Sequence, residues 1–168
     1  MASVTLRGNP CSLKGNMPKV GDKAPDFHLT KIDMSGVELA DLRGKTKIIV
    51  TVPSLDTPVC QVETRKFNER ASALPDTTVV LASADLPFAV KRFCAAEGVQ
   101  NVHGASDVRD RGFAERWGVA IADGPLQGIT ARAVFVVDKN DKVAYVELVP
   151  EIGQEPNYDA ALAAAAKD

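Results

Sequence analysis

Cys60 stands where a buried strand is expected to give way to a helix, a position that can turn a thiol into a nucleophile. The apolar run at 47–52 is typical of a central strand, and Pro53 and Thr57 follow it before the cysteine. Cys60 then falls in the first turn of a predicted helix, where free backbone N–H groups and the positive end of the helix dipole stabilise a thiolate. The competing interpretation is a cysteine packed as a small apolar side chain.

Arg132 is the second residue with chemical potential, because it is predicted on an apolar strand face with Val134 and Val136. A guanidinium on such a face requires an anionic or hydrogen-bonding partner. Either Asp56 or Glu63 could be that partner in a purely structural ion pair. On the residues alone, this structural role is the preferred interpretation.

Strands and helices alternate through the first two thirds of the chain, and a hairpin and a last helix follow. Thr57 is predicted to cap the first helix, and Asp85 to cap the second. The predicted elements are a hairpin or extended arm at 4–13, strands at 27–30, 37–39, 47–52 and 78–84, helices at 57–74, 85–98 and 109–117, a hairpin of 131–137 and 143–148, and a helix from 157.

This order of elements predicts a thioredoxin-like α/β fold. A βαβ half followed by a ββα half can share one central mixed sheet flanked by helices. We expect a single domain over 1–168, with an N-terminal β-hairpin extension at 1–16.

Composition narrows the classes of function. Twenty Lys and Arg residues face 22 Asp and Glu residues, so the chain has no positive field for nucleic acid or an anionic membrane surface. It also lacks an apolar stretch typical of a signal peptide or a membrane span, and we expect a cytoplasmic protein. We expect no metal and no cofactor, since the sequence shows neither metal-ligand spacing nor a phosphate-binding glycine loop. Reducing equivalents should then come from a protein.

With the Pro-x-x-x-Thr-x-x-Cys arrangement of Pro53, Thr57 and Cys60, the chain resembles the peroxiredoxins. Further stretches resemble the thiol peroxidase branch, which is the atypical two-cysteine type. They are 85–88, 91–94, 130–136 and 156–158, so the likeness covers nearly the whole chain. The chain departs from that pattern at Ala114 and Trp117, where glycine and tyrosine are expected. This departure concerns packing near the site rather than its chemistry.

The resemblance implies an antioxidant enzyme that reduces hydrogen peroxide and alkyl hydroperoxides. Cys60 would be the peroxidatic cysteine, whose thiolate attacks the terminal peroxide oxygen and becomes a sulfenic acid. Thr57 would hydrogen-bond the peroxide, and Arg132 would stabilise the thiolate and the charge on the breaking bond. Pro53 would shield the sulfur from water. With the resemblance, a catalytic role for Arg132 replaces the structural one as the preferred interpretation.

Cys94 is the resolving cysteine that the resemblance implies. Glu63 stands three residues after Cys60, so the C-x-x-C pair of thioredoxin is absent, and Arg65 occupies the resolving position of some other peroxiredoxins. A disulfide needs Cα atoms within about 7 Å. Two cysteines in formed helices would have to unravel locally to pair. A Cys94 packed in the core remains the alternative, and Cys11 is expected to have no role.

The resemblance also implies thioredoxin as electron donor and a homodimer with its interface near the active site. A peroxide-responsive redox sensor or thiol relay, and a structural thioredoxin-like binding module, remain as alternatives. Phe27, Phe88, Phe93 and Trp117 could line a substrate pocket, although core packing is expected for most of them.

Overall fold

The computed structural model describes residues 2–71 and 73–167, so Met1 and Asp168, the ends of the predicted domain, lie outside the described residues. The strands are β1 (Ser3–Leu6), β2 (Asn9–Lys14), β3 (His28–Lys31), β4 (Gly36–Glu38), β5 (Thr46–Thr51), β6 (Thr77–Ser83), β7 (Val102–Ser106), β8 (Ala120–Ile121), β9 (Ala133–Val137) and β10 (Val143–Leu148). The helices are the 3₁₀ helix η1 (Leu39–Leu42), α1 (Pro58–Ala71), α2 (Pro87–Glu97), α3 (Phe113–Arg116) and α4 (Tyr158–Ala166).

A mixed sheet in the order β10-β9-β5-β6-β7-β3-β4 forms the centre of the described chain. Strand β5 runs parallel to β6, and β6 runs parallel to β7, with α1 and α2 as the two crossover helices. Strand β9 is antiparallel to β5, and β10 is antiparallel to β9. The predicted thioredoxin-like fold is therefore confirmed. Because carboxyl ends of parallel strands share one edge of a sheet, the loops that lead into α1 and α2 start side by side.

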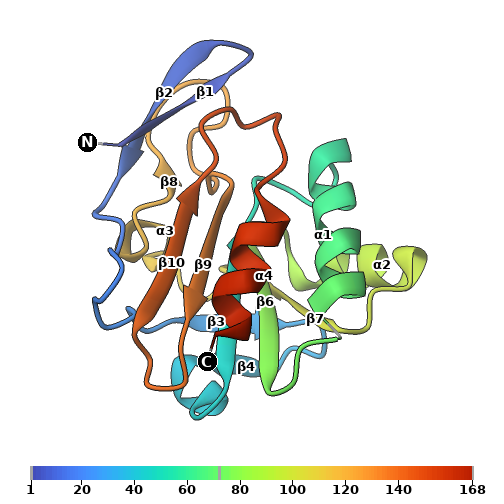
Figure 1. Cartoon of the computed structure of the whole chain (residues 1–168). Coiled ribbons are helices and arrows are strands. Elements are labelled where there is room, and N and C mark those ends of the chain that lie inside the picture. The colour runs from blue at the N-terminus through green and yellow to red at the C-terminus, as the bar shows by residue number, and fades with distance from the viewer. Residues whose placement is uncertain (1, 72, 168) are drawn as a thin grey trace.

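Helices α1, α2 and α4 cover one face of this sheet (Figure 1). The strands contribute alternate residues to that face, as Ile48 and Val50 do from β5, while Ile49 points to the opposite face. Phe67 of α1 has no exposed surface and packs edge-on against Tyr158 of α4, with 5.3 Å between ring centroids. These contacts hold α1, and with it the start of the helix, against the sheet.

The opposite face is covered by α3 and by a small sheet of β1, β2 and β8. Strands β1 and β2 form an antiparallel hairpin, which settles the choice between a hairpin and an extended arm. Its turn is at Arg7 and Gly8, both with positive φ, as a two-residue type I′ hairpin turn requires. Trp117 fills the space between this layer and the central sheet, and its ring centroid lies 5.0 Å from that of Phe135.

Several predicted details differ in the structure. Helix α2 has Leu86 rather than Asp85 at its N-cap, because the Asp85 carboxylate is bound elsewhere. Helix α1 runs from Pro58 to Ala71; of the rest of the predicted helix 57–74, residues 73–74 are not helical and Ser72 lies outside the described residues. Helix α3 is a single turn instead of a helix over 109–117. Arg132 immediately precedes β9 rather than lying within it. Within residues 2–71 and 73–167, every helix is too short or too polar to cross a bilayer.

Candidate active site

Cys60 lies in the first turn of α1, at the end of the loop that leaves β5, and has no exposed surface. Arg132, only 2% exposed, donates a hydrogen bond from Nη1 to the sulfur of Cys60 at 3.2 Å. The same Nη1 binds Oε2 of Glu63 at 2.6 Å, and Nε donates to the carbonyl of Ile152 at 3.0 Å. The guanidinium is therefore fixed in place with one edge directed at the cysteine.

Glu63 is the anionic partner that Arg132 requires, while Asp56, the other candidate, is exposed. Burial raises the pKa of Glu63 to about 7, although the charge of Arg132 beside it opposes the shift. Burial also disfavours the charge on Arg132, but Glu63 and Cys60 together raise the pKa of the guanidinium. A permanently charged cation is thus shared between the carboxylate and the sulfur.

Thr57 is positioned by a tight turn that begins at Ser54. Its hydroxyl donates to the carbonyl of Ser54 at 2.9 Å, and its backbone N–H donates to the same carbonyl at 3.3 Å. The predicted capping role had this hydroxyl as an acceptor, whereas here it is a donor to the preceding turn. Since Thr57 is half-buried and lines a cavity, its oxygen lies where a bound molecule can reach it.

A cavity of about 320 Å³ brings together Pro53, Thr57 and Arg132. Its other lining residues are mainly apolar and come from the hairpin, the start of α1 and the segments near 126 and 152; they include Leu6, Val59, Leu126, Ile129 and Ile152. Cys60 is buried and does not itself line the cavity, but its sulfur is hydrogen-bonded to Arg132, which does. The predicted catalytic residues, Cys94 apart, therefore meet at one site.

The hairpin forms part of that cavity wall, which the sequence did not reveal. Glu151 accepts hydrogen bonds from the N–H groups of Arg7 (2.8 Å) and Gly8 (3.3 Å) and from the hydroxyl of Thr5. These hydrogen bonds lower the pKa of Glu151, and the bond from Thr5 has the largest effect. The carboxylate thereby holds the hairpin tip, including Leu6, against the segment that also binds Arg132. No local spacing indicates a contact between residues so far apart in the chain.

The structure does not place Cys94 at this cavity. It lies on α2 as a buried free thiol against Gly104 of β7, and burial raises its pKa. It lines a separate cavity of about 440 Å³ with His103 and Lys31, which shares no lining residue with the cavity at Arg132. Cys11, the third free cysteine, is buried in β2.

The four aromatic residues considered for a substrate pocket lie elsewhere. Phe27 and Trp117 are fully buried, Phe93 is nearly so, and Phe88 is 69% exposed on α2. None of them lines the cavity at Arg132. Among residues 2–71 and 73–167, no group of three His, Cys, Asp or Glu side chains is arranged to hold a metal ion.

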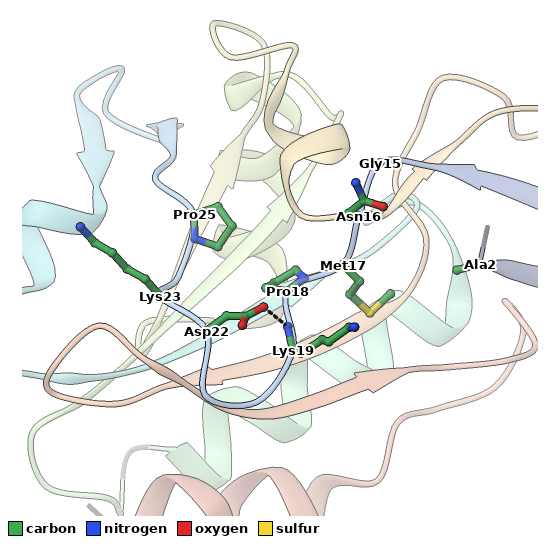
Figure 2. A pocket seen from close by; sticks show the side chains of 9 residues that line it. All are labelled: Ala2, Gly15, Asn16, Met17, Pro18, Lys19, Asp22, Lys23 and Pro25. Atoms are coloured by element: carbon green, nitrogen blue, oxygen red, sulfur yellow. Dashed lines mark hydrogen bonds between the residues drawn. The ribbon is translucent and has the colours of Figure 1, made fainter.

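A larger, more open cavity of about 820 Å³ lies along the segment between the hairpin and β3. Figure 2 shows the residues that line it, with the backbone N–H of Lys19 bonded to the carboxylate of Asp22 at 2.9 Å. It contains no cysteine and none of the predicted catalytic residues. Size alone therefore does not identify the site, and the chemistry favours the smaller cavity.

The chain is similar to known proteins over nearly its whole length. The Redoxin family model matches residues 19–162. A thiol peroxidase of Leptospira interrogans is 55% identical over 167 residues, and one of Mycobacterium tuberculosis is 53% identical over 164 residues, each alignment covering 98% of both chains. The crystal structure of a peroxiredoxin-like protein from Aquifex aeolicus matches with a TM-score of 0.95 and 48% identity, covering 99% of this chain and 97% of that one.

Proposed function

Because the chain belongs to the Redoxin family and is a thiol peroxidase of the peroxiredoxin type, we propose that Cys60 is its peroxidatic cysteine. The observation that carries this proposal is the 3.2 Å hydrogen bond from Arg132 to the Cys60 sulfur, beside a cavity lined by Thr57 and Pro53. A buried cation stabilises a thiolate far more strongly than water-exposed charge would, because the local dielectric is low. The arrangement suits an antioxidant peroxidase.

In the proposed first step, the Cys60 thiolate attacks the terminal oxygen of the hydroperoxide. The O–O bond breaks, sulfur is oxidised to a sulfenic acid, and the leaving hydroxide or alkoxide takes a proton from water to become water or an alcohol. The Arg132 guanidinium would stabilise the developing negative charge, and the Thr57 hydroxyl would hold the peroxide once its proton turns from the Ser54 carbonyl to the substrate.

Glu63 and the carbonyl of Ile152 would prepare Arg132 for this task. Each binds the guanidinium before any substrate arrives, so little reorganisation accompanies the reaction. Pro53 is buried and closes one wall of the cavity, which would keep water from the sulfur.

We propose that the substrates include alkyl hydroperoxides as well as hydrogen peroxide. The cavity wall offers Leu6, Leu126, Ile129 and Ile152, and such side chains favour an apolar substituent over water. Hydrogen peroxide needs only the polar end of the cavity, at Thr57 and Arg132.

We propose that Cys94 resolves the sulfenic acid. Its thiol would displace the hydroxyl group of oxidised Cys60, forming a disulfide and releasing water, and thioredoxin would reduce that disulfide. Both cysteines lie in formed helices, and Cys94 lines a cavity separate from the one beside Cys60, so the first turn of α1 and part of α2 would have to unravel. Because burial raises the pKa of Cys94, its thiol stays protonated until the helix unravels.

We also propose that the chain is a single cytoplasmic domain and assembles as a homodimer. Leu86 and Phe88 support the dimer, because they are large exposed apolar side chains at the start of α2. An interface near the active site would cover them.

Coupled turnover tests the proposal, with peroxide, thioredoxin, thioredoxin reductase and NADPH. Cys60→Ser should abolish NADPH consumption, and Cys94→Ser should abolish recycling by thioredoxin after one oxidation. Cys11→Ser is the matched control, since Cys11 is also a buried thiol but does not line the cavity, and it should retain wild-type turnover. A wild-type protein that oxidises once and stops would instead indicate a redox sensor or relay.

A further inference from the structure

Asp85 lies between β6 and α2, and its carboxylate binds the loop that leads to the reactive cysteine. Oδ1 accepts the hydroxyl of Ser54 at 2.8 Å, and Oδ2 accepts the backbone N–H of Leu55 at 2.8 Å. The hydroxyl of Ser83, at the end of β6, also donates to Oδ2 at 2.8 Å. Hydrogen bonds to an ionised acceptor are stronger than those between neutral groups. The carboxylate therefore anchors the loop after β5 to the end of β6.

Ser54 passes this restraint along the chain. Its hydroxyl, held by Asp85, accepts the N–H of Asp56 at 3.2 Å, and its carbonyl accepts both the N–H and the hydroxyl of Thr57. Thr57 lines the cavity and Cys60 follows one turn later. Asp85 thus fixes the shape of the whole segment that presents the proposed catalytic groups.

Asp85 also stands two residues before Pro87, where α2 begins. Cys94 lies on that helix. The residue that holds the loop before Cys60 therefore also stands at the start of the helix that carries Cys94.

We propose that Asp85 is a positioning residue that keeps the loop before Cys60 in its peroxide-binding shape and so delays disulfide formation. This inference rests on the proposed function, because it concerns the fate of a sulfenic acid at Cys60. It assigns Asp85 no contact with the reacting atoms.

The sulfenic acid has two competing fates. In one, the thiol of Cys94 attacks it, and a disulfide and water form. In the other, it reacts with a second hydroperoxide, giving a sulfinic acid and one water or alcohol. Only the first fate requires the loop and α2 to rearrange, so the bonds to Asp85 slow it and leave more time for the second.

Asp85→Asn tests this role, because the amide keeps the side chain's size but replaces an acceptor oxygen with an NH₂ group. Disulfide formation should accelerate about tenfold, the effect of losing roughly one hydrogen bond to a charged acceptor. The peroxide concentration that gives half overoxidation should rise at least about tenfold with it, while the reaction of Cys60 with peroxide slows about threefold. Rapid mixing, thiol alkylation and mass spectrometry report all three.

Two further variants sharpen the test. Ser54→Ala removes only the loop side of the cluster and should shift the same rates in the same directions, which decides the matter if Asp85→Asn fails to fold. Asp159→Asn removes a charge from an exposed side chain on α4 and should leave all rates unchanged.

Opposite shifts in the two steps distinguish positioning from a general stabilising role, which would slow both. Wild-type rates for both steps, or a slowing of both, would overturn the assignment to Asp85 while leaving the peroxidase mechanism in place. A wild-type protein that forms no sulfenic acid at Cys60 would overturn both.

Discussion

The ion pair inside the site predicts an unusual pH dependence of stability. Arg132→Met keeps much of the side chain's length but removes the cation that faces Glu63, which has no exposed surface. The comparison is best made in a Cys60→Ser background, so that thiol ionisation does not contribute. Loss of the hydrogen bond to Ile152 adds a constant cost of about 1–3 kcal/mol, because a buried carbonyl loses its donor.

The pH-dependent part follows from the pKa of Glu63, which burial raises from its ordinary value of 4.5 to about 7. Between these values the folded chain binds more protons than the unfolded one, so stability falls as pH rises. Above about pH 7 the wild-type curve levels off, because Glu63 is then ionised in both states. Without Arg132 the pKa is higher still, and the variant continues to lose about 1.4 kcal/mol per pH unit.

Urea unfolding at several pH values measures the difference between the two proteins. The difference should be constant from pH 5 to 7 and grow by about 2.7 kcal/mol between pH 7 and 9. In a matched pair that also carries Glu63→Gln, the growth should vanish. A difference that stays constant from pH 5 to 9 would refute the coupling between Arg132 and Glu63.

Three further results are expected. Thr57→Val should slow oxidation of Cys60 by hydrogen peroxide about a hundredfold, because it removes the hydroxyl whose proton would turn from the Ser54 carbonyl to the peroxide; stopped-flow measurements report the rate. Glu151→Gln should raise KM for a bulky alkyl hydroperoxide about fivefold with little effect on hydrogen peroxide, because weaker hydrogen bonds no longer hold the hairpin against the cavity; steady-state kinetics separate the two. Phe67→Ala should destabilise the fold by about 3–5 kcal/mol in urea unfolding, because it empties a packed site beside Tyr158.

Each expectation has a control and a contrary result. Thr57→Ser should retain most of the rate, and a fully active Thr57→Val would remove the hydroxyl from the mechanism. Asp123→Asn, at an exposed carboxylate bonded to β2, should leave both KM values unchanged, whereas equal effects on both peroxides would contradict the role given to Glu151. A cost below about 1 kcal/mol for Phe67→Ala would contradict tight packing of α1.

Much of the fold can be predicted from the sequence, because it depends on interactions between residues close together in the chain. An apolar run, a turn and a helix-starting Pro58 place Cys60 in the first turn of α1, and each step depends only on neighbouring residues. The β9–β10 hairpin and α4, which begins after Asn157, can be predicted in the same way.

The prediction that Asp85 caps α2 was wrong, and the reason is also physical. Its carboxylate satisfies the loop and Ser83 instead of the helix N-terminus, because tertiary partners compete with local ones.

The sequence by itself determined where the proposed nucleophile lies, in the first turn of its helix, since a cysteine at a strand-to-helix junction is a local pattern. Only the tertiary structure decided what surrounds it. The pairing of Thr51 with Ala133 brings Arg132 to the Cys60 loop, and Glu63 becomes its partner because it lies one helical turn after Cys60 on the buried side of α1. Such contacts depend on strand register and on which helix face packs inward, and these are properties of the whole fold.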